Sequence, residues 1–132
     1  MPHITLEYTS NISQPPDLRS VFANLHGILA QVGGVHIENC KSRALAHDTF
    51  YIGDGDAQRA FVHLEVLLVE GRSPRWIEHV GTELLECLEQ AFAASKRDFD
   101  LQITVNFVDL VRQRYFKYPA GTLTPLDELE LK

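Results

Sequence analysis

A pattern of strand, long helix and strand occurs twice along this chain, and it constrains the fold more than any other feature. In the first half, residues 3–9 alternate apolar and polar side chains, as in a strand with one buried face. A helix is expected from Asp17, which can cap its first turn, to Gly33, which ends it. An interrupted extended stretch over 40–52 follows, and the turn signal at 53–56 separates the two halves.

The second half repeats the pattern. Residues 60–69 form the strongest strand, apolar on both faces, which predicts a central position in a sheet. Ser73 as a cap and Pro74 at the first helical position begin the second helix, and the last strand is expected over 99–108. Right-handed crossovers between parallel strands place both helices on one face of the sheet. We therefore expect an α+β fold: β-α-β repeated twice, one sheet, and two long helices on one face.

The size of the chain fits one core. It has 132 residues, of which 45% are hydrophobic, so we expect a single domain over 1–132. The second face of the sheet needs cover, and the apolar positions on both faces of 60–69 predict that other subunits supply it. The tail from about 119, and in particular its leucine-bearing segment 122–132, could pack on a neighbouring subunit or be a loose end.

Charge and composition exclude several classes of protein. The net charge of -6 disfavours nucleic-acid binding, because phosphate contacts need a basic face. No apolar run is long enough to span a bilayer, and no signal peptide is evident. Cys40 and Cys87 form no paired motif, which is typical of reduced thiols. We expect a cytoplasmic protein with neither membrane nor nucleic-acid partners.

No motif indicates a metal or an organic cofactor. The six histidines include no HExxH motif and no tight pair with cysteine. Asp54 and Asp56 are typical turn residues, and the remaining calcium ligands are missing from their loop. There is no GxSxG, P-loop or dinucleotide fingerprint. We expect no metal site and no cofactor.

Pro2 is the most informative single residue. A small residue after the initiator methionine generally permits removal of Met1, which would leave a prolyl secondary amine at the N-terminus. An ordinary α-amino group has a pKa of about 7.7–8.0, and burial or nearby cations lower it. An amine that is neutral at physiological pH can take a proton from carbon or from a hydroxyl. Proline at this position is also common for no catalytic reason, so Pro2 alone leaves both interpretations open.

Three cations stand where they could hold an anion. Lys41 and Arg43 lie two positions apart in an extended stretch, so they share a face. Arg72 follows the 60–69 strand at the start of the second helix, a position that attracts anions. These side chains are candidates for binding a carboxylate. The alternative is that Arg72 is a solvated surface arginine and that Lys41 and Arg43 form ordinary salt bridges.

Several segments together resemble one enzyme family, that of 5-carboxymethyl-2-hydroxymuconate Δ-isomerase in the tautomerase superfamily. The segments that carry the resemblance are 2–8, 10–12, 40–43, 60–64 and 71–73. It extends over nearly the whole chain, to about Pro119, and the combination is specific although each piece alone is weak. The resemblance implies a doubled β-α-β fold and a homotrimer, which would cover the open face of the sheet.

The resemblance also implies roles for the candidate residues. Pro2, freed of Met1, would move a proton from the 2-hydroxyl to C5 of a muconate, a compound of homoprotocatechuate breakdown. Arg72 would bind a carboxylate and stabilise developing charge. Where the family has a second functional arginine, this chain has Lys41, which keeps the charge but loses the planar two-point grip. Arg43, on the same face, would then assist in substrate binding.

We therefore expect an isomerase with a small anionic substrate. Two alternatives stay open. One is a tautomerase of a different 2-oxo acid such as phenylpyruvate, which the lysine at position 41 permits. The other is a catalytically inactive trimeric binding protein that kept the fold. If Met1 is retained, the Pro2 nitrogen is an amide and has no basicity.

Overall fold

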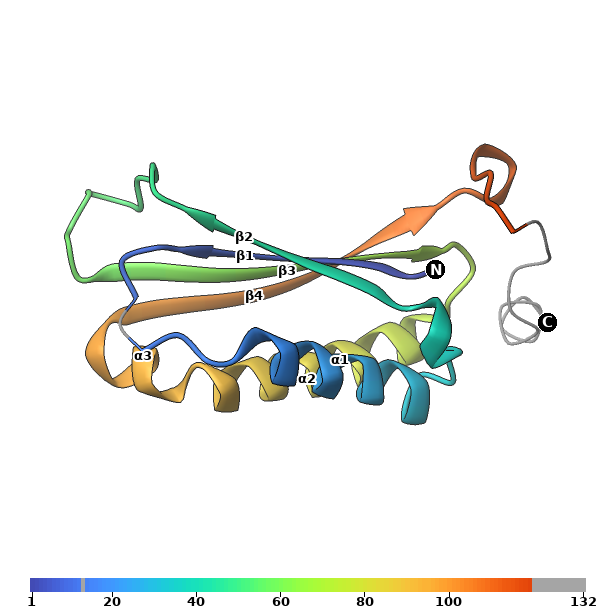
Figure 1. The fold of residues 1–132 in the computed structure, drawn as a ribbon, viewed down its shortest axis with the longest axis horizontal. Helices are drawn as coiled ribbons and strands as arrows, with labels where there is room; N and C mark the ends of the chain where they lie inside the picture. Colours follow the sequence, from blue (N-terminus) through green and yellow to red (C-terminus); the bar gives the residue numbers. More distant parts are fainter. Residues whose placement is uncertain (13, 120–132) are drawn as a thin grey trace.

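The computed structural model describes residues 1–12 and 14–119, and within them a four-stranded sheet is covered on one face by helices (Figure 1). The segment 122–132 therefore lies outside the described residues. The strands are β1 (His3–Thr9), β2 (Lys41–His47), β3 (Arg59–Val69) and β4 (Asp100–Leu110). The helices are α1 (Leu18–Gln31), α2 (Pro74–Ala91) and α3 (Ala93–Asp98), with 3-10 turns η1 (Ile37–Asn39) and η2 (Arg112–Arg114).

The topology confirms two β-α-β units joined in one sheet. The strand order is β2-β1-β3-β4, with β1 parallel to β2 and β3 parallel to β4, while β1 and β3 run antiparallel. Helices α1 and α2 cross over the same face, as right-handed connections require. Two details differ from the expectation. β2 ends at His47, so the rest of 40–52 is loop, and the short helix α3 is additional.

Both long helices begin at the side chains that the sequence indicates. Asp17 caps α1 by accepting a hydrogen bond from Arg19 N at 3.2 Å. Ser73 caps α2, with its Oγ accepting from Trp76 N at 3.1 Å, and Pro74 occupies the first turn, where a missing N–H costs nothing. Because these caps fix where α2 starts, they also fix the position of Arg72 just before it.

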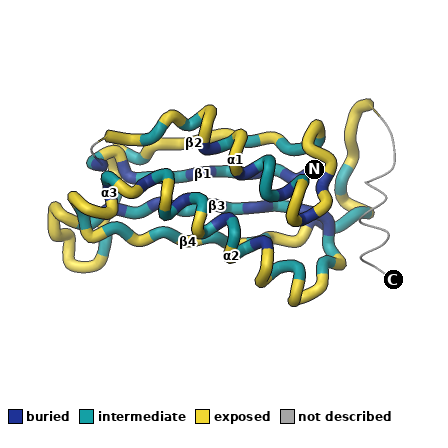
Figure 2. The backbone as a smooth tube through the Cα atoms, turned by 90° about the horizontal axis from the view of Figure 1, so that it is seen from below, coloured by how far each residue is buried: buried dark blue, intermediate teal, exposed yellow. Residues whose placement is uncertain are grey.

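The core lies between the sheet and the two long helices. Alternate residues of β1 and β3 point into it, as the two-residue period of a strand requires. Figure 2 shows this buried backbone in the middle of the sheet, whereas β2 is largely exposed. The residues at 0% exposure from these strands are Ile4, Leu6, Ala60, Val62, Leu64 and Val66, and the helices add Leu29, Val80, Leu84 and Leu88. Burial of each valine, leucine or isoleucine side chain among them stabilises the fold by about 1.5–3 kcal/mol.

The other face of the sheet is more polar than the sequence suggests. Its positions on β3 are Phe61, His63, Glu65 and Leu67, and all four are half-buried. In its centre, His63 Nδ1 lies 2.6 Å from the Thr104 hydroxyl and Glu65 Oε1 accepts a hydrogen bond from Asn106 Nδ2 at 2.6 Å. The prediction that β3 is apolar on both faces is thus right only toward its ends, because these two polar residues occupy the centre.

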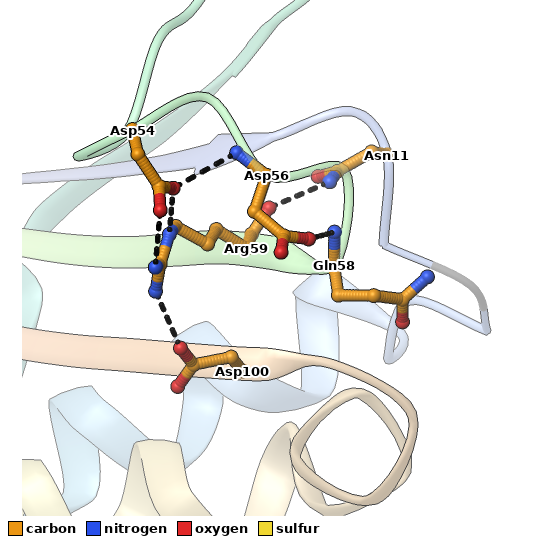
Figure 3. A network of polar contacts seen from close by, with 6 residues as sticks. All are labelled: Asn11, Asp54, Asp56, Gln58, Arg59 and Asp100. Carbon is orange, nitrogen blue, oxygen red and sulfur yellow. Dashed lines mark hydrogen bonds and ion pairs between the residues drawn. The ribbon is translucent and has the colours of Figure 1, made fainter.

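The loop between the two halves is held by Arg59 (Figure 3). Its Nε donates to Asp54 Oδ1 at 2.9 Å and its Nη1 to Asp100 Oδ2 at 2.8 Å. Asp54 Oδ1 also accepts from Asp56 N at 3.1 Å, the local bond expected of a turn aspartate. The Arg59 hydrogen bond, then the Asp56 backbone and the Arg59 charge, lower the pKa of Asp54 to about 2. This network fixes the end of the sheet that lies away from the N-terminus.

Within residues 1–12 and 14–119, no helix combines the length and the apolar character needed to cross a membrane.

Candidate active site

The N-terminus is anchored at the end of the sheet where β3 and β4 finish (Figure 1). Met1 is only 6% exposed and forms a small cluster with Val69 and Leu110, against which Tyr115 packs. Pro2 is buried directly behind it. The first two residues therefore sit in an apolar environment on a rigid part of the fold.

The side chain of Lys41 and the N-terminal amine donate hydrogen bonds to the same backbone carbonyl. The amine of Met1 donates to Asn39 O at 2.9 Å, and Lys41 Nζ donates to the same oxygen at 3.0 Å. The backbone N–H of Lys41 also donates to Pro2 O at 3.1 Å. The two cationic groups are therefore close neighbours, and the predicted association of Lys41 with position 2 is present in the structure.

This environment disfavours a charged amine. Burial is the largest cause, and the hydrogen bond and charge of Lys41 follow; together they lower the pKa of the Met1 amine to about 5. The charge of Lys117 acts in the same direction, whereas Cys40 opposes it. An amine at this place is mainly neutral at physiological pH. With Met1 attached, the nitrogen of Pro2 is an amide.

Arg72 lies at the same end of the sheet, one residue beyond Gly71, whose φ of 103° favours glycine. Its Cζ is 4.6 Å from the centre of the Trp76 ring, a cation–π contact, and its Nε and Nη1 are buried. The indole Nε1 of Trp76 donates to Gly33 O at 3.0 Å. The guanidinium is thus held on an aromatic surface that is itself tied to the end of α1.

Arg43 lies one step further along the open face. The register pairs Lys41 with His3 and Arg43 with Thr5, so the two cations share a face as predicted. Nη2 of Arg43 is 3.2 Å from His3 Nδ1. Burial, followed by the charges of the N-terminus, Arg43 and Lys41, lowers the pKa of His3.

Two residues after β4 belong to this end of the molecule and were not singled out from the sequence. The hydroxyl of Tyr115 is 2.9 Å from His3 Nε2. Arg112 donates its backbone N–H to Glu70 Oε2 at 3.1 Å, and its buried Nε and Nη2 find no hydrogen-bond partner among the described residues. The sequence showed a basic stretch after the last strand, but nothing local indicated that it turns back to the N-terminus.

Among the described residues, no group of three or more His, Cys, Asp or Glu side chains could hold a metal ion. Cations outnumber carboxylates at the N-terminal end, where Lys41, Arg43, Arg72 and Arg112 lie with Glu70, and this excess suits an anionic ligand.

Comparison with known proteins assigns the family. The family model of 5-carboxymethyl-2-hydroxymuconate isomerase matches residues 2–120. The chain belongs to this family. The 5-carboxymethyl-2-hydroxymuconate Delta-isomerase of Escherichia coli is 33% identical to it over 94 residues, which is 71% of this chain and 75% of that protein.

Solved structures similar to this chain support the same family assignment. A 5-carboxymethyl-2-hydroxymuconate isomerase from Deinococcus radiodurans R1 matches with a TM-score of 0.79 and 27% identity, covering 88% of this chain and 87% of that one. A fused 4-OT symmetric trimer matches with a TM-score of 0.61 and 12% identity over 81% of this chain and 85% of that one, which shows the fold alone. The fold is that of the tautomerase superfamily.

Proposed function

We propose that this chain is an isomerase of unsaturated 2-hydroxy acids with two or more carboxylates, such as 5-carboxymethyl-2-hydroxymuconate, with the amine of Pro2 as its base. The observation that carries the proposal is the environment of the N-terminus. Met1 is buried against Val69 and Leu110, and its amine shares the acceptor Asn39 O with Lys41; we propose that the amine of Pro2 meets the same surroundings once Met1 is removed. Such a site keeps an amine neutral at the pH at which it must accept a proton.

The proposed reaction needs only one proton-carrying group. Removal of Met1 exposes the secondary amine of Pro2, which takes the proton from the 2-hydroxyl. The electrons of that O–H bond form the C2 carbonyl, the C2–C3 double bond moves to C3–C4, and the electrons of C4–C5 take up the proton at C5. The enol becomes a conjugated ketone, and the Pro2 amine returns to its neutral form.

The cations around the N-terminus would hold the substrate and its developing charge. Arg72 offers a planar guanidinium for a carboxylate or for the negative charge that builds up as the 2-hydroxyl loses its proton. Lys41 adds a point charge beside the base, which both binds an anion and lowers the pKa of the amine. Arg43 supplies a second guanidinium on the open face.

We further propose that the protein works as a homotrimer, with other subunits covering the open face of the sheet beyond its N-terminal end. Leu45 on β2 is 54% exposed, and Phe116 and Tyr118 after β4 are 89% and 95% exposed, which leaves apolar surface uncovered in a single chain. The related fold solved as a symmetric trimer supports this arrangement. Both cysteines are free, which supports the cytoplasm as the compartment.

One observation favours a second candidate. Lys41 occupies the position at which the family resemblance implies an arginine. An ammonium group cannot make the bidentate hydrogen bonds that a guanidinium makes to a carboxylate. A 2-oxo acid with a single carboxylate, such as phenylpyruvate, would tolerate this loss. The second candidate is therefore tautomerisation of such an acid by the same Pro2 base.

The test compares the two substrates on protein whose N-terminal residue has been determined by intact mass. We expect turnover of 5-carboxymethyl-2-hydroxymuconate, followed by ultraviolet absorbance, to exceed that of phenylpyruvate enol. Pro2→Ala should lower turnover by about 100-fold or more, in the range of general-base catalysis, with the assembly unchanged. Near-normal turnover by Pro2→Ala would remove Pro2 from the mechanism, and a preference for phenylpyruvate would favour the second candidate.

A further inference from the structure

A pocket on the open face of the sheet begins one residue from Pro2. It encloses about 400 Å³, and its walls combine the polar side chains of His3, Arg43 and Tyr115 with the apolar Leu67 and Val108. Tyr115 is shared between two places, since it lines this pocket and also packs against the cluster formed by Met1, Val69 and Leu110. The pocket therefore adjoins the buried N-terminus through one side chain.

The hydrogen bonds in the pocket have only one consistent direction. A guanidinium has donors and no acceptor, so Arg43 Nη2 donates to His3 Nδ1 across 3.2 Å. His3 Nδ1 is then unprotonated, and Nε2 of the neutral ring carries the hydrogen. This N–H donates to the Tyr115 hydroxyl oxygen at 2.9 Å, which leaves the hydroxyl hydrogen of Tyr115 directed away from His3. The lowered pKa of His3 agrees with a neutral ring.

We propose that Arg43 and the hydroxyl of Tyr115 form a carboxylate-binding subsite in this pocket, with His3 as the positioning residue that turns the tyrosine hydroxyl into a donor. The pocket thus offers an anion the remaining N–H groups of Arg43 and one O–H, next to an apolar wall for a carbon chain. The anion is a second carboxylate arm of the substrate, and this assignment rests on the proposed function. It places one carboxylate beside Arg72 and another on Arg43 and Tyr115, on the open face.

Glu65 also lines the pocket and would repel a carboxylate if its charge were directed inward. Its Oε1 accepts a hydrogen bond from Asn106 Nδ2 at 2.6 Å, and its Oε2 lies 3.7 Å from His63 Nε2. Oε1 is thus held toward β4, on the side of β3 away from Arg43. The donors of Arg43 and Tyr115, with Glu65 Oε1 held away from Arg43, predict a site for a single carboxylate arm.

The test measures binding of an unreactive dicarboxylate, so that it does not depend on turnover. Adipate and the monocarboxylate hexanoate are titrated by calorimetry into the full-length protein, its Tyr115→Phe variant and the control variant Tyr51→Phe. Tyr51 is 78% exposed in the loop at the other end of the sheet. We expect Tyr115→Phe to weaken adipate binding about tenfold, as loss of one hydrogen bond to a charged group does. Hexanoate can use the Arg72 side alone and should change less than about twofold.

The ring of His3 gives an independent readout. Nitrogen NMR of the imidazole should show the hydrogen on Nε2 at neutral pH, and His3→Phe should weaken adipate binding by about the same factor as Tyr115→Phe. Unchanged adipate affinity in Tyr115→Phe, or a hydrogen on Nδ1 of His3, would overturn the proposal. So would dissociation of the assembly in Tyr115→Phe by sedimentation, because the residue would then be a subunit contact. Adipate binding that depends on Tyr115 in a protein without isomerase activity would instead refute the proposed function and keep the subsite.

Discussion

Lys41 and the amine of Met1 donate to the same backbone oxygen, that of Asn39, at 3.0 and 2.9 Å. A buried amine and an exposed lysine, both cationic in water, are thereby held together at one end of the sheet. Mutual repulsion and burial both favour loss of a proton, and the amine yields first because its ordinary pKa of 8.0 lies below that of a lysine. The arrangement lowers the pKa of the Met1 amine, and we propose that it acts on the amine of Pro2 in the same way once Met1 is removed.

Lys41→Met should therefore raise the pKa of the N-terminal amine. In the chain that begins with Met1, the pKa should move up from about 5 without reaching 8.0, since burial is the larger cause and remains. In the chain that begins with Pro2, the acid limb of the rate profile should move to higher pH. Amine-specific labelling as a function of pH measures the first effect. Lys96→Met, in α3 beside Glu89, is the control, and an equal shift there would contradict the role of Lys41.

The ring of Trp76 supports Arg72, and the indole N–H holds that ring in place by donating to Gly33 O. Trp76→Phe keeps an aromatic face and loses the hydrogen bond to Gly33, so we expect a loss of about 1 kcal/mol in the free energy of unfolding by urea. Trp76→Leu loses the cation–π contact as well, so it should cost about 1 kcal/mol more and raise KM for the dicarboxylate. Equal KM values for the two variants would contradict the support of Arg72 by the ring.

The two helix caps provide a matched pair. Ser73→Ala and Asp17→Ala each remove a capping hydrogen bond from a backbone N–H, and Asp17→Ala also removes the bond from Ser20 Oγ; each should lower the free energy of unfolding by about 1 kcal/mol. Ser73 adjoins Arg72, whereas Asp17 caps the other long helix, α1. We expect only Ser73→Ala to raise KM measurably. A comparable rise in Asp17→Ala would indicate that general loss of stability, not the position of Arg72, controls binding.

The Arg59 network predicts a dependence of stability on acid. The pKa of Asp54 is about 2 in the folded chain and 3.8 in its ordinary state. A lowered carboxyl pKa stabilises the fold above the ordinary value, and this contribution is lost as the pH falls toward the folded value. Arg59→Met should remove this part of the acid sensitivity, seen as a flatter urea midpoint between pH 4 and pH 2. An unchanged dependence of the urea midpoint on pH would mean that Arg59 does not lower the pKa of Asp54.

Local signals explain why most of the fold could be predicted. The alternation in β1, the cap at Ser73 and the proline after it depend on residues close together in the sequence, and the structure confirms all three. The parallel pairs within each half follow from the handedness of crossovers. Helix α3 was missed because it is six residues long and continues directly from α2, where no separate periodicity can be recognised.

The site could be predicted only in part, because its contacts join distant segments. The place of Lys41 beside the N-terminus follows from strand pairing, and the shared face with Arg43 follows from the two-residue period. The contact of His3 with Tyr115 spans 112 positions and depends on how the chain turns after β4. Likewise, no local pattern predicts that His63 and Glu65 contact Thr104 and Asn106 on the open face.

The most direct test of the Pro2 base compares two preparations of the same chain that differ only in Met1, each verified by intact mass. Turnover of 5-carboxymethyl-2-hydroxymuconate is measured at neutral pH, with assembly checked by light scattering. The account predicts that the chain beginning with Pro2 is active and that the chain retaining Met1 is slower by about 100-fold or more, since its Pro2 nitrogen is an amide. Equal turnover by the two preparations would contradict a catalytic role for the amine of Pro2.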